Sequence, residues 1–193
     1  MVLMPYSDLK FDEATKQQLL TVAKASITYG LTHHRPSTVT LSDYSPALQQ
    51  LGASFVTLEK QGELRGCIGS LEAHRPLLVD IAENAFAAAF QDPRFPPLQE
   101  QELNELEVHI SLLTSAEPFP IKDEADLLRQ LNIGIDGLIL QEGRHRATFL
   151  PSVWESLPDP KQFLAQLKLK AGLPSDYWSS TLSFERYQAK LVK

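Results

Sequence analysis

The chain has 193 residues, of which 43% are hydrophobic and 22% charged, a composition typical of a folded globular protein and not of a disordered one. Its 18 Lys and Arg against 24 Asp and Glu give a formal net charge of −6, and no local basic run offsets this charge. We therefore expect no nucleic acid as a partner, because an acidic chain without a local basic patch has no field to draw it onto a phosphate backbone. No apolar stretch approaches the roughly 20 residues that cross a bilayer, so we expect a soluble protein with no membrane partner.

The cellular compartment is predicted from two further features. Met1–Asp8 has no basic region followed by a long apolar core, so we expect no secretory signal. Cys67 is the only cysteine and cannot form an intramolecular disulfide, which favours a reducing compartment. The sequence thus predicts a cytoplasmic protein.

The first part of the chain predicts a helix followed by a hairpin. The helix is expected over Glu13–Tyr29, with apolar residues recurring on one face and Gly30 ending it. Two short strands then follow, Ala53–Lys60 and Glu63–Leu71, joined by a tight connection that contains a glycine. Such a connection is typical of an antiparallel hairpin.

A second helix and another strand are predicted next. Pro76 suits the first turn of a helix, and Pro93 ends that helix because proline disfavours helix in the residue before it. Leu106–Thr114 alternates as a strand, with Glu107, His109 and Ser111 sharing one face.

The second part of the chain repeats this kind of pattern. It predicts a helix, a hairpin, another helix and a closing strand, over Glu124–Leu131, Gly137–Leu150, Pro160–Ala171 and Leu182–Tyr187. Strand pairs and helices are interspersed without a regular βαβ order. We therefore predict an α+β fold of antiparallel sheets flanked by helices.

The two hairpins resemble each other. When they are aligned with one deletion, Arg65 matches Arg146 and Cys67 matches Thr148, and a helix follows each hairpin. This suggests an internal duplication of a hairpin–helix unit, although short hairpins are alike by necessity.

The strand around Cys67 is the first candidate site. Gly66 and Gly69 flank the cysteine, and glycines in a strand mark a bulge or the close approach of a backbone or ligand. Strict alternation would place Arg65, Cys67 and Gly69 on one side, so that a thiol lies beside a cation that favours the nucleophilic thiolate. The alternative is a small buried residue that lets a helix pack on the sheet.

The turn that follows the second helix is the next candidate. Arg94 lies between Pro93 and Phe95-Pro96-Pro97, and a rigidly held guanidinium suits a carboxylate or phosphate. Asp92 would orient it, unless the two residues form a purely local pair. With Arg65, Gly66 and Gly69, these two residues complete the predicted binding site for a small anionic ligand.

Candidate proton-transfer groups accompany the thiol. His74 follows the strand of Cys67 and is the best candidate for a general base, and Glu83 on the second helix is an alternative. Asp80, Glu83 and Asn84 share the polar side of this helix, and a solvated face explains them more simply than a pocket does.

Metal and cofactor sites are not predicted. None of the five histidines has the His-Glu-x-x-His spacing, and no cysteine pair is available. A solvated strand face also accounts for His109, Glu107 and Ser111 more simply than a catalytic triad does. No phosphate-binding loop or dinucleotide fingerprint occurs.

Four short motifs occur in a fixed order along the chain. They are Leu64-Arg65-Gly66-Cys67-Ile68-Gly69, Asp92-Pro93-Arg94-Phe95-Pro96-Pro97, Ser111-Leu112-Leu113-Thr114 and Arg146-Ala147-Thr148-Phe149-Leu150-Pro151. Each motif alone is weakly informative, but the ordered set is highly specific. It resembles the AMMECR family, called AmmeMemoRadiSam system protein A in bacteria and archaea, from about Gly52 to the C-terminus.

The resemblance implies one AMMECR-type domain over residues 1–193, made of a larger and a smaller α+β subdomain packed together. It also implies two partners, a Memo-like protein related to ring-cleaving dioxygenases and a radical SAM protein, and it brings no demonstrated activity. Many members of the family have a second cysteine where this chain has Lys168. Cys67 would therefore act alone.

Two functions remain open. In the first, the protein is a binding or accessory component that acts through the surface around Cys67. In the second, it is an enzyme that uses Cys67 as nucleophile or covalent carrier on an anionic small molecule. The sequence leans to the first function, because no complete catalytic constellation can be assembled from it.

Overall fold

A computed structural model describes residues 12–193 of the chain. The described residues form two compact units. Unit 1 contains those up to Leu113 together with Lys190–Lys193, and unit 2 contains Thr114–Ala189. The segment Met1–Asp8, for which no secretory signal is expected, lies outside the described residues.

Two long helices form one layer of unit 1. In α1 (Glu13–His33), the N-cap Asp12 accepts a 2.8 Å hydrogen bond from the backbone N–H of Thr15. The predicted stop at Gly30 is wrong, since α1 continues for three more residues. A Cβ at Gly30 would lie 2.6 Å from the ring of Phe90 in α2 (Leu77–Phe90). The glycine therefore permits close helix packing and does not end the helix.

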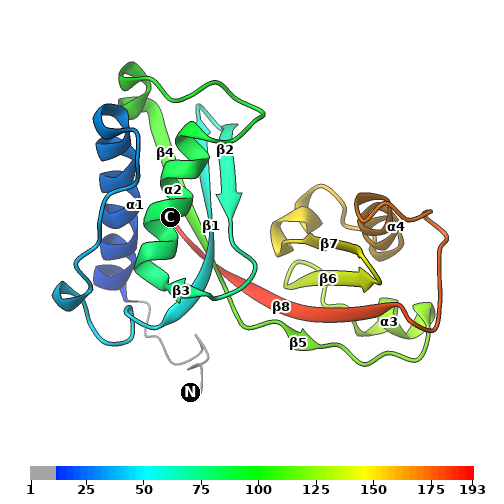
Figure 1. Cartoon of the computed structure of the whole chain (residues 1–193). Helices are drawn as coiled ribbons and strands as arrows, with labels where there is room; N and C mark the ends of the chain where they lie inside the picture. Colours follow the sequence, from blue (N-terminus) through cyan, green and yellow to red (C-terminus); the bar gives the residue numbers. More distant parts are fainter. Residues whose placement is uncertain (1–11) are drawn as a thin grey trace. The chain divides into compact units, whose positions relative to one another are not determined.

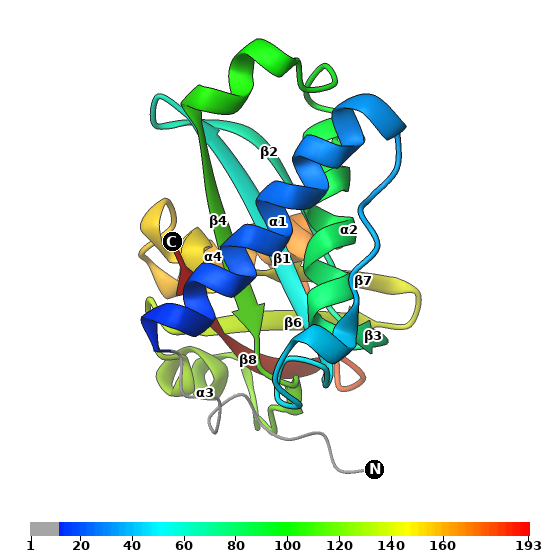
Figure 2. The ribbon, with the colours of Figure 1, turned by 90° about the vertical axis from the view of Figure 1, so that its left-hand side faces the viewer.

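The strands of unit 1 form an antiparallel sheet beside these helices (Figures 1 and 2). The central strand β1 (Leu51–Lys60) pairs with β2 (Glu63–Gly69) on one side and β4 (Leu106–Leu113) on the other. The short β3 (Arg75–Pro76) pairs with the start of β1. Two 3-10 helices, η2 (Leu41–Asp43) and η3 (Glu100–Glu105), complete the unit.

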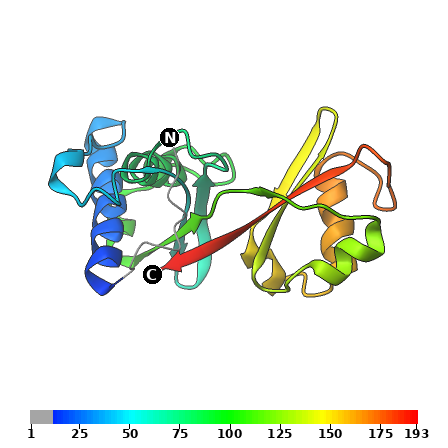
Figure 3. The same ribbon diagram turned by 90° about the horizontal axis from the view of Figure 1, so that it is seen from below.

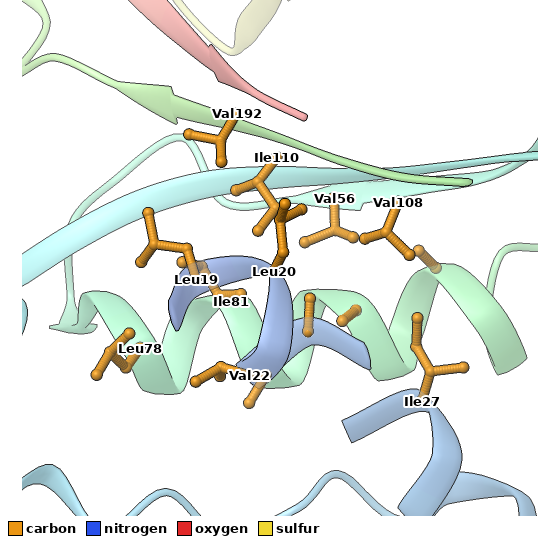
Figure 4. Packing of buried hydrophobic residues seen from close by; sticks show 14 of the residues in the cluster. Leu19, Leu20, Val22, Ile27, Val56, Leu78, Ile81, Val108, Ile110 and Val192 are labelled. Atoms are coloured by element: carbon orange, nitrogen blue, oxygen red, sulfur yellow. The ribbon is translucent and has the colours of Figure 1, made fainter. Parts of the chain in front are cut away.

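The core of unit 1 lies between the sheet and the two helices. Figure 4 shows Val56 of β1 and Ile110 of β4 facing Leu19 of α1 and Ile81 of α2. All four side chains are at most 1% exposed. The alternation along β1 and β4 therefore divides the sheet into one apolar face under the helices and one more polar face turned away from them.

Unit 2 has its own sheet, helices and core (Figure 3). Its elements are β5 (Glu117–Pro118), α3 (Glu124–Gln130), β6 (Asp136–Glu142), β7 (His145–Phe149), η4 (Pro151–Glu155), α4 (Pro160–Lys170) and β8 (Ser183–Val192). In its core the ring of Trp154 stacks on Phe163, with centroids 3.8 Å apart. Strands β8, β6 and β7 are neighbours in that order, all antiparallel.

The predicted α+β fold with antiparallel sheets and flanking helices is confirmed. The closing strand is longer than predicted, because β8 continues past Tyr187 to Val192. Its last residues return to unit 1, where Val192 is fully buried in the core beside β4. Within residues 12–193, no helix combines the length and apolar character needed to span a bilayer.

Candidate functional site

The face of the unit 1 sheet that is turned away from α1 and α2 is called the outer face here. Val56, Leu58 and Ile110 point into the helical core, so their neighbours in sequence point the other way. The outer face thus consists of side chains from three adjacent strands: Phe55, Thr57, Glu59, Cys67, Gly69, Glu107, His109 and Ser111.

Cys67 is partly exposed on this face, in the edge strand β2. It pairs with Thr57 of β1, and its Sγ lies 3.3 Å from the Thr57 hydroxyl. Its backbone N–H donates to Oδ2 of Asp92 at 2.9 Å, and its carbonyl accepts from Nη2 of Arg94 at 3.3 Å. The side chains of Asp92 and Arg94 therefore form hydrogen bonds with the backbone N–H and the carbonyl of Cys67, respectively.

Asp92 and Arg94 form the ion pair that the sequence suggests. Nε of Arg94 donates to one carboxylate oxygen at 2.9 Å and Nη2 to the other at 2.7 Å. The Asp92 carboxyl is only 2% exposed, and the hydrogen bond from Arg94 holds its pKa well below the usual range. The hydrogen bond to Asp92 in turn raises the pKa of Arg94.

Arg94 also offers hydrogen-bonding capacity to solvent. Its side chain is 54% exposed, and its Cζ lies 5.5 Å from the centroid of the Phe95 ring. Nη1 has no hydrogen-bond partner among residues 12–193. One side of the guanidinium is therefore fixed, while the other side is open to an anion.

Arg65 does not lie beside the thiol as strict alternation predicts. The pairing shifts between Leu58 and Glu59, so that Gly66 faces Leu58, Leu64 faces Glu59, and Arg65 is the extra residue of a bulge. Its side chain turns to η3, where Nε and Nη2 donate to the two carboxylate oxygens of Glu102 at 2.8 and 3.1 Å.

The Arg65–Glu102 pair is a mostly buried bidentate contact. Arg65 is 9% exposed, its Nη2 also donates to the carbonyl of Pro96, and its Cζ lies 6.0 Å from the ring of Phe95. The guanidinium lowers the pKa of Glu102 to about 2. The arginine that neighbours Cys67 is therefore Arg94, while ligand binding by Arg65 stays a prediction.

The two glycines beside Cys67 are needed for packing. A Cβ on Gly66 would collide with the backbone carbonyl of Ala88, because α2 approaches β2 closely at this point. A Cβ on Gly69 would collide with the ring of Phe55 on the outer face. Close approach of another part of the chain explains both glycines, and their predicted contact with a ligand is not tested.

The predicted proton-transfer groups have other partners. His74 is exposed, with Nδ1 2.9 Å from the carbonyl of Glu72. Glu83 forms an ion pair with Arg75. The group at hydrogen-bonding distance from the Cys67 sulfur is instead the hydroxyl of Thr57.

The solvated face that the sequence indicates on α2 holds for Glu83, whose side chain is 42% exposed, but not for Asp80 and Asn84. Asp80 is fully buried and Asn84 is 4% exposed. Asp80 accepts hydrogen bonds from Ser54, Asn84 and Arg75, so this part of α2 is tied to β1 by a buried network. The prediction failed because a hydrophobic periodicity does not reveal polar groups that satisfy each other inside a protein.

Strand register groups residues of the outer face that the sequence pattern does not connect. Thr57 of β1 lies between Cys67 of β2 and His109 of β4, so a thiol, a hydroxyl and an imidazole form one row across three strands. Glu59 and Glu107 form the next row. Each strand shows its own alternation in the sequence, but only the pairing reveals which residues are neighbours.

Comparison with known proteins gives a consistent result. The AMMECR1 family model matches residues 20–192. A protein of Methanothermobacter thermautotrophicus is 37% identical over 97% of both chains, and one of Sulfolobus acidocaldarius is 39% identical over 91% of this chain and 78% of its own.

A solved structure shares the fold. The crystal structure of an uncharacterised protein from Pyrococcus horikoshii has a TM-score of 0.86 and 30% identity, covering 95% of this chain and 93% of its own. The resemblance predicted from the four ordered motifs is confirmed by these matches. The chain belongs to the AMMECR1 family.

Proposed function

We propose that this protein is a binding component that holds an anionic group of a partner protein or small molecule at Arg94, next to Cys67. The observation that carries the proposal is the asymmetry of the Arg94 guanidinium. Nε and Nη2 are fixed by the buried Asp92, while Nη1 lies on a half-exposed side chain with no partner among the described residues. A fixed planar cation of this kind loses little entropy when it binds a carboxylate or phosphate.

The family resemblance supplies the first partners to test. It implies a Memo-like protein and a radical SAM protein, and carboxylate side chains on either would suit Arg94. Cys67 and Thr57 would lie at the rim of such a contact, because the carbonyl of Cys67 accepts from the same guanidinium.

Binding would be measured by calorimetry with the Memo-like and radical SAM proteins from the same organism, and by NMR titration with acetate and inorganic phosphate. Arg94→Gln should weaken binding by about tenfold or more, since it removes a charge-assisted contact. Arg129→Gln is the matched control, because Arg129 is an exposed arginine paired with Asp126 in unit 2. Equal affinities of the two variants would contradict the proposal.

A second function is supported by the sulfur itself. Cys67 is partly exposed, its Sγ lies 3.3 Å from the Thr57 hydroxyl, and Arg94 donates to the carbonyl of the same residue at 3.3 Å. A thiol in such a position suits a nucleophile or covalent carrier for an anionic substrate. Cys67→Ser would then abolish covalent modification by a substrate while leaving the melting temperature nearly unchanged. If this variant unfolds instead, the thiol is structural.

A further inference from the structure

Three metal-ligating side chains meet on the outer face, in the row next to Thr57. Glu59 of β1 is paired with Glu107 of β4, and His109 is two residues further along β4 on the same face (strands in Figure 1). Nδ1 of His109 lies 3.7 Å from a Glu59 oxygen, and Nε2 lies 3.9 Å from a Glu107 oxygen. One ligand atom from each of the three residues can be chosen so that all lie within 4.8 Å of one another.

Among residues 12–193, no lysine or arginine lies within ion-pair distance of this cluster. Two carboxylates directly opposite each other on neighbouring strands repel and destabilise the pairing. The neighbouring Lys60 is directed elsewhere, with Nζ 3.9 Å from Glu102 and 3.7 Å from Glu105.

The imidazole between the two carboxylates has unused hydrogen-bonding capacity. The His109 side chain is only 20% exposed, yet neither ring nitrogen makes a hydrogen bond within residues 12–193, because 3.7 and 3.9 Å are too long. A mostly buried imidazole whose nitrogens make no hydrogen bond among these residues, placed beside two carboxylates, is a ligand set that a cation would complete.

We propose that Glu59, Glu107 and His109 bind a first-row divalent metal ion, with Zn²⁺ as the preferred ion. Imidazole nitrogen together with carboxylate oxygen suits Zn²⁺ better than Mg²⁺ or Ca²⁺, which favour oxygen ligands alone. Zinc bonds of about 2.0–2.1 Å place tetrahedral ligands roughly 3.3 Å apart. Rotation of the two flexible glutamate side chains would close the spacing of 4.8 Å or less to that value.

The backbone around this site is fixed by strand pairing, and its three ligands leave a coordination position open. Both strands are held in register by antiparallel pairing from Ala53 to Lys60, so the ligands need no backbone rearrangement. Three protein ligands leave the fourth tetrahedral position to water or to an oxygen of an anion. The bound ion would thus add a Lewis-acidic centre to the sheet that carries Cys67. It does not depend on the proposed binding at Arg94.

The experiment is calorimetric titration of the full chain, freed of metal, with Zn²⁺ alone. We expect one saturable site, with affinity reduced more than about tenfold in His109→Asn, Glu59→Gln and Glu107→Gln, because each removes a ligand. Three controls should retain wild-type affinity. His74→Asn removes an exposed histidine, Glu63→Gln an exposed strand glutamate, and Cys67→Ser the thiol that would otherwise be the alternative zinc ligand.

The outcomes are distinguishable. Unchanged affinity in the three ligand variants would overturn the proposal, and so would loss of binding in Cys67→Ser or His74→Asn. Absence of saturable binding to the wild-type chain would show that His109 only forms ion pairs with the two glutamates. A second measurement needs no variant. Mn²⁺ added to the wild-type protein should selectively broaden the NMR signals of Thr57, His109 and their neighbours, and selective broadening elsewhere would also overturn the proposal.

Discussion

The backbone N–H of Cys67 donates a 2.9 Å hydrogen bond to the carboxylate of Asp92, 25 residues further along the chain. Since β2 is an edge strand, this side chain occupies the place where a neighbouring strand would bind, and Arg94 does the same for the Cys67 carbonyl. The Asp92–Arg94 pair therefore covers part of an edge that would otherwise be free to pair with another chain.

Unit 2 contains a comparable contact at its own edge strand. The carbonyl of Thr148 in β7, the residue aligned with Cys67 in the comparison of the two hairpins, accepts a 2.9 Å hydrogen bond from Nζ of Lys170. The two contacts are alike: Arg94, just beyond the end of α2, donates to the carbonyl of Cys67, and Lys170, the last residue of α4, donates to that of Thr148. This similarity agrees with an internal duplication, which stays a prediction.

Asp92→Ala should destabilise unit 1 by about 2 kcal/mol. The change removes the acceptor for the Cys67 N–H, whereas the 54% exposed Arg94 can turn to solvent and adds little to the cost. Urea unfolding followed by circular dichroism measures the effect. Asp43→Ala removes an exposed aspartate and should change stability by less than about 0.5 kcal/mol, so equal effects would refute the role of Asp92.

Glu102 should make the protein sensitive to acid. Its pKa is about 2 in the folded chain and near 4.5 without its partners, so the stabilisation is fully present above pH 4.5. It is lost as the pH falls towards 2, because protonation breaks the contact with Arg65. At neutral pH the shift is equivalent to roughly 3 kcal/mol.

Thermal unfolding between about pH 6 and pH 2 tests this prediction. Glu102→Gln should lower stability at neutral pH and flatten the dependence in the acid range. Glu100→Gln, which changes an exposed glutamate of the same 3-10 helix, should leave the profile as in the wild type. A Glu102→Gln profile parallel to that of the wild type would show that the Arg65 contact contributes nothing.

Gly66→Ala should be poorly tolerated, with a loss of about 3 kcal/mol in unfolding free energy. The added methyl group would collide with the Ala88 carbonyl, and a helix backbone cannot move away as a flexible side chain can. Gly62→Ala is the control, because its φ of +80° is unfavourable for alanine but no atom lies within 4 Å, so about 1 kcal/mol is expected. A smaller effect at Gly66 than at Gly62 would mean that α2 does not need the glycine.

Alkylation of Cys67 in the folded protein should depend on the charge of the reagent. Arg94 lies next to the cysteine and is half exposed, so it should attract iodoacetate but not the neutral iodoacetamide. Arg94→Gln should therefore lower the iodoacetate rate severalfold more than the iodoacetamide rate, as measured by mass spectrometry. If the ratio of the iodoacetate rate to the iodoacetamide rate is the same in the wild type and in Arg94→Gln, the guanidinium is too far from the sulfur to affect its reaction.

Lys168 shows how a buried charge is accommodated in unit 2. Its side chain is 1% exposed, with Nζ 2.7 Å from a Glu124 oxygen and 5.4 Å from the Trp178 ring centroid. Lys168→Met should change stability by less than about 1 kcal/mol, because the apolar chain keeps its packing and the 44% exposed Glu124 can turn to solvent. Lys168→Ala should cost about 2–3 kcal/mol through lost packing, and urea unfolding would compare the two. A larger loss in Lys168→Met would show that the ion pair itself stabilises α3 and α4.

Patterns that can be read along the chain predict the fold class, the family and most of the helices and strands correctly. The alternation along β1 and β4 involves only residues close together in sequence, and so do the N-caps of α1 and α4. Such patterns can be recognised without knowing how distant segments pack. The predicted end of α1 at Gly30 is wrong because the sequence does not distinguish a glycine that ends a helix from one that lets a neighbouring helix pack closely.

Which side chains share a site depends on how distant segments pack against each other. The bulge at Arg65 turned that residue to Glu102, and Arg94 took the place next to Cys67. Strand register brought His109 and Glu59 together, although they are far apart in the chain. Such neighbours depend on pairing between distant segments, and a one-residue change in register would move each side chain to the opposite face.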